Sequence, residues 1–145
     1  MSVSVDTNLL VYAADPDSPH HEKAKSFILN QGEDLILTQL VLVELYMLLR
    51  NKVVFKKPYS AQEAAQYCQT LARNPYWRCV DYMPEVQTKL WKWAENTNRG
   101  ARNIIDARIA FTLQHHGVTH FATANVKDFQ DLGFDQVWNP LVESF

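Results

Sequence analysis

The sequence predicts an α/β fold, a single domain over residues 1–145 with a parallel β-sheet core flanked by helices. Short β-prone segments alternate with longer helical segments along the chain, which is the pattern of β–α–β units. The chain has 145 residues, of which 47% are hydrophobic and 21% charged, as expected of one globular domain with a normal core. Only four glycines and six prolines are present, which leaves little room for linkers.

The N-terminal half contains five expected elements. In chain order they are a strand over 2–5, a helix over 7–14, a helix over 20–31, a strand over 35–38 and a helix over 39–50. The turn sequence DPDSP ends the first helix, and Gly32 ends the second, whose apolar residues recur with helical spacing. The last helix is favoured by its Leu, Glu and Met content, and a basic loop, NKVVFKKPY, follows it.

The C-terminal half continues the alternation. We expect a helix from Ser60 to about Arg73, a strand over 77–80, a helix over 84–98, a helix over 103–116 and a β-prone run over 118–123. Ser60-Ala-Gln-Glu63 is a capping box, Pro84 suits a first helical turn, and Gly117 suits a helix end. The tail from 137 to 145 has no clear pattern.

Asp106 lies on an unexpected face of the helix NIIDARIAFTLQHHG. The spacing predicts a wet face of Arg108, Thr112 and His115, and a dry face of Ile105, Ile109, Ala110 and Leu113. Asp106 is about 200° from Arg108 around the helix axis. The helix is therefore expected to direct this carboxylate among its own apolar residues.

Three further acids have notable positions. Asp6 directly follows the first strand, Glu44 is the only polar residue of LVLVELYMLL, and Asp128 follows the strand that runs to Thr123. Residues just past the carboxyl ends of parallel strands converge on one crevice. Taken singly, Glu44 could be a satisfied core hydrogen-bonder, Asp6 a helix N-cap and Asp128 a solvated loop acid.

Together, the four acids favour a metal site. A buried carboxylate without a cationic partner is costly, and one divalent ion would neutralise several at once. Carboxylates without His or Cys suit a hard ion, Mg²⁺ or alternatively Mn²⁺. Such a site orients a water and stabilises charge on phosphate oxygens. The chemistry expected from the residues is therefore phosphoryl transfer to water.

Four motifs carry a resemblance to a known family. VDTNLLVYA, VELYMLLR, NIIDARIA and FATANVKDF, in this order, resemble the PIN-domain ribonucleases and, more narrowly, the VapC toxins of type II toxin–antitoxin pairs. The match runs from residue 3 to about residue 140. By resemblance Asp6, Glu44 and Asp106 match the three core metal-site acids and Asp128 the more variable fourth. Asn8 and Thr123 match supporting polar residues, and Asn125 stands where some relatives have an acid.

The resemblance implies a Mg²⁺-dependent endoribonuclease that acts as a toxin. Its expected substrate is a single-stranded or loop region of structured RNA such as tRNA or rRNA, and its expected partners are a second copy in a homodimer and a VapB-type antitoxin. Attack by water would leave a 5′-phosphate and a 3′-hydroxyl. A housekeeping PIN nuclease and a non-catalytic PIN-like binding module remain alternatives. A haloacid-dehalogenase-like phosphatase is disfavoured because Asn8 stands where its second Asp belongs.

The formal net charge of −2 is unusual for an RNA-binding protein. When the four site acids are left out, however, the rest of the chain has 12 acidic and 14 basic residues. Positive charge gathers in two segments, which carry Arg50, Lys52, Lys56 and Lys57, and Arg99 and Arg102. These residues are candidates for phosphate contacts, or ordinary solvated charges. Phe55 and Tyr59, which interleave with the first segment, could stack on unpaired bases, or be core or dimer contacts.

Other classes are disfavoured. The two cysteines are too few for a disulfide framework, and the absence of CxxC argues against zinc. The start MSVSVD resembles no signal peptide, and the longest apolar run, residues 40–49, is shorter than the roughly 20 residues a membrane helix needs. We therefore expect a cytoplasmic protein. Trp91 and Trp93 lie about 200° apart on one helix, which suggests that one is exposed or lies in a subunit interface.

Overall fold

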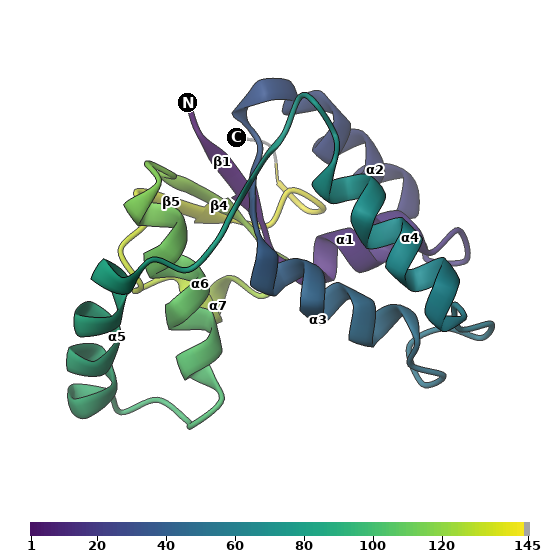
Figure 1. The fold of residues 1–145 in the computed structure, drawn as a ribbon. Helices are drawn as coiled ribbons and strands as arrows, with labels where there is room; N and C mark the ends of the chain where they lie inside the picture. The colour runs from purple at the N-terminus through teal and green to yellow at the C-terminus, as the bar shows by residue number, and fades with distance from the viewer. Residues whose placement is uncertain (144–145) are drawn as a thin grey trace.

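A computed structural model describes residues 1–143 as alternating strands and helices (Figure 1). The N-terminal half contains β1 (Val3–Val5), α1 (Thr7–Ala14), α2 (His21–Asn30), the 3-10 helix η1 (Gly32–Asp34), β2 (Ile36–Thr38), α3 (Gln39–Leu49) and α4 (Ala61–Ala72). The C-terminal half contains β3 (Arg78–Val80), α5 (Pro84–Asn96), α6 (Asn103–His115), β4 (His120–Ala122), α7 (Val126–Phe129) and β5 (Gln136–Trp138). The predicted α/β class is confirmed.

All strand pairs in the described residues are parallel. β1 pairs with β4 and β4 with β5, while β2 pairs with β3. A parallel bridge between Val3 and Leu35 places β2 beside β1. β1 and β2 are buried at every position, because helices cover the sheet on both sides (Figure 1). Since all strands run the same way, their carboxyl ends meet at one edge.

Most element boundaries agree with the sequence patterns to within a residue or two. α1 covers the predicted residues 7–14. The Ser60 hydroxyl accepts a hydrogen bond from the Glu63 amide, and the Glu63 carboxylate accepts one from the Ser60 amide, so the capping box is present. Gly117 has a φ of +88°, which few other residues adopt. η1, α7 and β5 were not predicted, and residues 144–145 of the unassigned tail lie outside the described residues.

The predicted division of α6 into a wet and a dry face holds for His115 on one side and Ile109, Ala110 and Leu113 on the other, but it is wrong at two positions. Thr112, expected on the wet face, is 3% exposed, whereas Ile105, expected on the dry face, is 39% exposed. The cause is tertiary: α6 lies between α5 and β2, so its central turns are covered from several sides. Its first turn, which carries Asp106, is less deeply covered.

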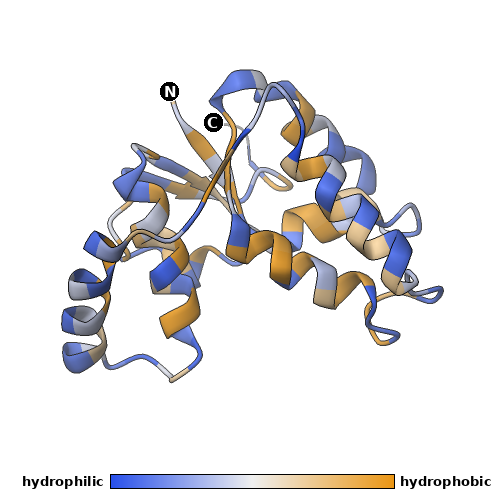
Figure 2. Cartoon of the chain, in the orientation of Figure 1, coloured by the Kyte–Doolittle hydropathy of each residue, from blue (hydrophilic) through white to orange (hydrophobic). Residues whose placement is uncertain are grey.

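α3 also differs from a simple amphipathic helix. Its inner face, which includes Leu45 and Leu49, is fully buried, yet Val43 and Met47 on its outer face are 56% and 65% exposed. In Figure 2 hydrophobic colour accordingly runs along most of α3, while α5 is mostly hydrophilic. Within residues 1–143, no helix has the length and apolar character needed to cross a membrane.

Candidate active site

The four acids singled out from the sequence come from four separate segments and gather at the carboxyl edge of the sheet. Asp6 follows β1, Glu44 lies on α3, Asp106 in the first turn of α6 and Asp128 on α7. The negative charges of Glu44 and Asp128 both act on Asp6, and those of Asp6 and Asp128 act on Asp106. The fold therefore brings together the predicted acidic cluster.

Asp6 is the most enclosed of the four. It is the N-cap of α1, and its Oδ1 accepts a hydrogen bond from the Thr7 amide at 2.7 Å. Its Oδ2 accepts another, also at 2.7 Å, from the Thr123 hydroxyl. Burial raises the pKa of Asp6 to about 6, and the charges of Glu44 and Asp128 add to this, although both hydrogen bonds oppose it. The N-cap role and the clustering with other acids are thus combined in one residue.

Glu44 and Asp106 are half-buried, and the charge of Asp106 acts on Glu44. The Thr7 hydroxyl donates a hydrogen bond to Glu44 Oε1 at 3.2 Å, and Asn103 Nδ2 donates one to Asp106 Oδ2 at 3.1 Å. Burial raises the pKa of Glu44, with the charge of Asp106 adding to the effect. Burial and then the charge of Asp6 raise the pKa of Asp106 to about 6, against the opposing influence of Arg99.

The Thr123 hydroxyl organises one side of the cluster. Thr123 is fully buried, and besides donating to Asp6 it accepts from the Asn125 amide at 2.9 Å. Asn8 Nδ2 approaches the same oxygen at 3.4 Å, while Asn8 Oδ1 accepts from the Ala124 amide at 3.3 Å. The polar residues expected to support the acids therefore form a network around Asp6.

Asp128 is held by its neighbour in the chain. Asn125 Nδ2 donates a hydrogen bond to Asp128 Oδ2 at 2.5 Å. Asn125 therefore presents its amide nitrogen, rather than its oxygen, to the acid. This arrangement favours Asp128 as the fourth acid and Asn125 as its support.

Sequence reasoning missed two residues that bear on the acids, Thr7 and Asn103, and gave Arg99 a different role. Thr7 bonds Glu44, Asn103 bonds Asp106, and Arg99 lowers the pKa of Asp106 by its charge. Asn103 had a readable signal, because residues three apart on a helix are neighbours. The contact between Thr7 and Glu44 spans 37 residues and has no local signal.

The donor set suits a hard divalent cation. It consists of carboxylates, and no ion pair in residues 1–143 joins Lys, Arg or His to any of the four acids. Repulsion between the negative charges of the acids accordingly contributes to the raised pKa values of Asp6 and Asp106. Within the described residues, however, no three His, Cys, Asp or Glu side chains already stand in a chelating arrangement. The carboxylates of the cluster are chemically suited to bind a cation, but the described side chains are not arranged around a common point as metal ligands.

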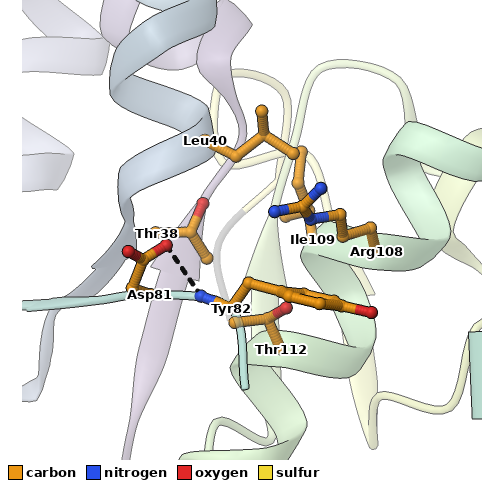
Figure 3. A pocket seen from close by; sticks show the side chains of 7 residues that line it. All are labelled: Thr38, Leu40, Asp81, Tyr82, Arg108, Ile109 and Thr112. Atoms are coloured by element: carbon orange, nitrogen blue, oxygen red, sulfur yellow. Dashed lines mark hydrogen bonds between the residues drawn. The ribbon is translucent and has the colours of Figure 1, made fainter. Parts of the chain in front are cut away.

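A small hollow lies between the start of α3, the segment after β3 and α6 (Figure 3). It is lined by Thr38, Leu40, Asp81, Tyr82, Arg108, Ile109 and Thr112. The Arg108 guanidinium lies over the Tyr82 ring, 4.1 Å from its centroid, and Asp81 Oδ1 accepts from the Tyr82 amide at 2.8 Å. Because Arg108 is about 200° from Asp106 around the α6 axis, the hollow opens on a different face of α6 from this acid.

The structure separates the two basic segments. Lys52, Lys56 and Lys57 are exposed in the loop after α3, and the Arg50 guanidinium donates to the Tyr46 hydroxyl. This loop begins about 9 Å along the axis from Glu44, at 1.5 Å per residue. Arg102 is exposed, whereas Arg99 is engaged with α7.

Of the aromatic residues of the first basic segment, Phe55 belongs to the core and Tyr59 is partly buried against it. Phe55 is 5% exposed, and the Tyr59 hydroxyl donates to the Ala14 carbonyl at 2.8 Å. Of the two tryptophans on α5, Trp91 is 52% exposed, while Trp93 packs edge-on against Phe111. Trp91 is thus exposed on this chain, in agreement with the prediction of a tryptophan that is exposed or lies in a subunit interface.

Comparison with known proteins places the chain in a family. The PIN domain model matches residues 3–135, so the chain belongs to the PIN domain family, as the four motifs predict. Within that family it is 43% identical over 141 residues to Ribonuclease VapC24 of Mycobacterium tuberculosis strains CDC 1551 / Oshkosh and ATCC 25618 / H37Rv. The match covers 96% of this chain and 97% of the relative, which confirms the predicted VapC likeness.

Solved structures show the same fold at lower identity. The structure of M. tuberculosis VapC20, described as a Sarcin-Ricin loop cleaving toxin, superposes with a TM-score of 0.66 at 17% identity, covering 83% of this chain and 87% of that one. FitAB bound to an IR36 DNA fragment gives 0.68 at 15% identity over 99% and 98% of the two chains. FitAcB from Neisseria gonorrhoeae gives 0.68 at 16% over 97% and 99%.

Proposed function

We propose that this chain is a divalent-metal-dependent endoribonuclease that acts as the toxin of a toxin–antitoxin pair. The observation that carries the proposal is the convergence of Asp6, Glu44, Asp106 and Asp128 at one sheet edge, where the charge of each acts on another. A relative 43% identical to this chain is named a ribonuclease, which supports the same chemistry.

The acids would hold Mg²⁺, or alternatively Mn²⁺. When bound, such an ion supplies positive charge where negative charge builds on the phosphate oxygens. Thr7 and Thr123 orient the carboxylates by hydrogen bonds, and Asn103 and Asn125 do the same for Asp106 and Asp128.

The proposed substrate is a single-stranded or loop region of structured RNA, such as tRNA or rRNA. An unpaired strand can bring one phosphate to an open acidic edge, which a duplex enters less easily. Lys52, Lys56, Lys57 and Arg102 are exposed and would contact phosphates along the strand, with Arg50 beside them.

Cleavage of a labelled hairpin RNA by the full chain tests the proposal. We expect cutting with Mg²⁺ or Mn²⁺, none in EDTA, and at least a hundredfold loss in Asp106→Asn. Asp17→Asn is the matched control, because Asp17 is an exposed carboxylate in the turn after α1. Full cleavage in EDTA, or by Asp106→Asn, would overturn the assignment of the acids.

The chemical structure of the new RNA ends shows whether water or the RNA 2′-hydroxyl is the nucleophile. Recruiting the 2′-hydroxyl requires a general base such as His. In residues 1–143 the histidines stand away from the acidic edge: His20 and His21 flank the start of α2, His115 and His116 the end of α6, and His120 begins β4. We therefore expect 5′-phosphate and 3′-hydroxyl ends by mass spectrometry. A 2′,3′-cyclic phosphate would contradict attack by water.

We further propose that the toxin forms a two-fold homodimer through the outer face of α3. A two-fold contact joins the same surface patch of both subunits, so a neutral apolar patch is favoured over one whose like charges would meet. Val43 and Met47, one turn apart, form such a patch, and the single charged residue of α3, Glu44, belongs to the acidic cluster. Light scattering should give a dimer mass for the wild type and a monomer for Val43→Glu. A monomeric wild type at micromolar concentration would refute the interface.

A VapB-type antitoxin is the proposed inhibitor. Its reading frame should lie next to that of the toxin. The purified product of that frame, added at one equivalent, is expected to abolish RNA cleavage. Undiminished cleavage at a tenfold excess would contradict a toxin–antitoxin pair while leaving the nuclease assignment intact.

A further inference from the structure

We propose that Arg99 is a positioning residue that fastens the short helix carrying Asp128 to the segment that leads into Asp106. This inference rests on the proposed function, because it assigns Arg99 to the assembly of the acidic site. It also separates Arg99 from the exposed basic residues expected to contact RNA.

The geometry of the Arg99 side chain supports this role. Its Nη1 donates to the Asp128 carbonyl at 3.0 Å, and its Nη2 donates to the Lys127 carbonyl at 3.0 Å. Nη2 also forms an ion pair with Asp131. The side chain is 18% exposed. One planar guanidinium therefore contacts three acceptors within five consecutive residues, a use of its fork that Lys cannot reproduce.

The helix that Arg99 contacts needs an external support. α7 has four residues, and a single turn is unstable alone because few hydrogen bonds offset the fixed backbone. The last carbonyls of any helix lack intrahelical donors, and a basic side chain can supply them. At the other end of α7, Asn125 bonds the Asp128 carboxylate. Asp128 is thus fixed through its backbone by Arg99 and through its side chain by Asn125.

Arg99 itself belongs to a structured turn. Its amide donates to the Thr97 hydroxyl at 3.1 Å, and the Asn103 amide at the start of α6 donates to the Gly100 carbonyl at 3.1 Å. Asn103 in turn bonds Asp106. The contact from Arg99 to Asp128 spans 29 residues, so it joins the two acid-bearing segments that chain connectivity leaves independent.

Amide hydrogen exchange of the metal-free protein tests the fastening directly. We expect Arg99→Gln to accelerate exchange at residues 126–132 at least tenfold, with the amides of β1 and β4 unchanged. Arg102→Gln removes an exposed positive charge from the same segment and should leave exchange at 126–132 unaltered. Exchange of residues 126–132 at the wild-type rate in Arg99→Gln would overturn the proposal, whether or not the variant still cleaves RNA.

A second variant covers the case in which Arg99→Gln does not fold. Arg99→Lys keeps the charge but reaches fewer acceptors at once, so residues 126–132 should exchange at a rate between that of the wild type and that of an unprotected chain. Wild-type exchange at these residues in Arg99→Lys would overturn the proposal.

Kinetics separate positioning from RNA binding. For Arg99→Gln we expect kcat at saturating Mn²⁺ to fall at least tenfold and KM for RNA to stay within twofold, with weaker Mn²⁺ binding by calorimetry of the free protein. A raised KM with unchanged kcat would mean that Arg99 binds phosphate instead. If the wild type cleaves no RNA, the proposed function fails, while exchange and Mn²⁺ binding still decide the role of Arg99.

Discussion

Replacing Asp106 by Asn should stabilise the metal-free protein near neutral pH. The pKa of Asp106 is raised from 3.8 to about 6 by burial and by the charge of Asp6. A shift of about two units corresponds to about 3 kcal/mol. Because the side chain is half-exposed, solvent screening reduces this to roughly 1.5 kcal/mol. Asn keeps an oxygen that can accept from Asn103, so little is lost in exchange.

The sign of the effect depends on pH. A raised pKa means that the folded state binds the proton more tightly than the unfolded state does. Below about pH 4 both states of the wild type are protonated, so Asp106→Asn should match it. As the pH rises through 6, Asp106 of the folded wild type becomes charged, and the wild type loses free energy of unfolding that the variant keeps. At pH 7.5 the variant should therefore unfold about 5 °C higher, from the usual entropy of unfolding of a chain this long.

Urea unfolding in EDTA at pH 4 and pH 7.5 measures the difference in free energy of unfolding between the variant and the wild type, and thermal unfolding measures the shift in temperature. Asp17→Asn, in which an exposed carboxylate is removed, should show no comparable gain. Added Mg²⁺ should reverse the order, because the ion stabilises only the folded wild type. A variant that is less stable than the wild type at pH 7.5, or equally more stable at both pH values, would refute the reasoning from charge repulsion.

Three further outcomes follow from the hydrogen bonds and charges. Thr123→Val removes the donor to Asp6, so an NMR titration should find the pKa of Asp6 above 6 and cleavage should fall at least tenfold. Ser60→Ala breaks the capping box of α4 and should lower the free energy of unfolding by about 1 kcal/mol, measured in urea, with cleavage unchanged. Arg102→Gln should reduce the salt dependence of RNA binding by about 0.7 in the logarithmic slope. A slope equal to that of the wild type would remove Arg102 from the RNA contacts.

The elements with strong local signals were predictable. α4 begins at a capping box whose two hydrogen bonds form within four residues of chain, and α6 ends before a glycine at positive φ. β5 has no such signal, because it exists through its pairing with β4. α7 is a single turn, too short to show a periodicity. Local rules therefore located most elements and missed the short η1, α7 and β5.

The acids of the site were predictable for a topological reason. Asp6 and Asp128 follow strands, and parallel strands end at one edge, so their neighbourhood follows from connectivity without knowledge of packing. Which faces of α6 are buried, by contrast, does not follow from chain connectivity. Periodicity identifies one apolar stripe, but α5 and β2 cover α6 from different sides, and Thr112 is buried as a result.

Arg99 shows why a charge near an acidic site is ambiguous in sequence. A basic residue ahead of Asp106 could neutralise a phosphate, pair with a carboxylate or cap a helix, and all three uses place a cation in the same segment. What decides is whether unpaired carbonyls lie within reach, and those of α7 come from a segment 29 residues away. Arg102, three residues further on, meets no such acceptor in the described residues and stays exposed. Of two similar arginines, tertiary contacts thus turn one toward the carbonyls of α7 and leave the other exposed.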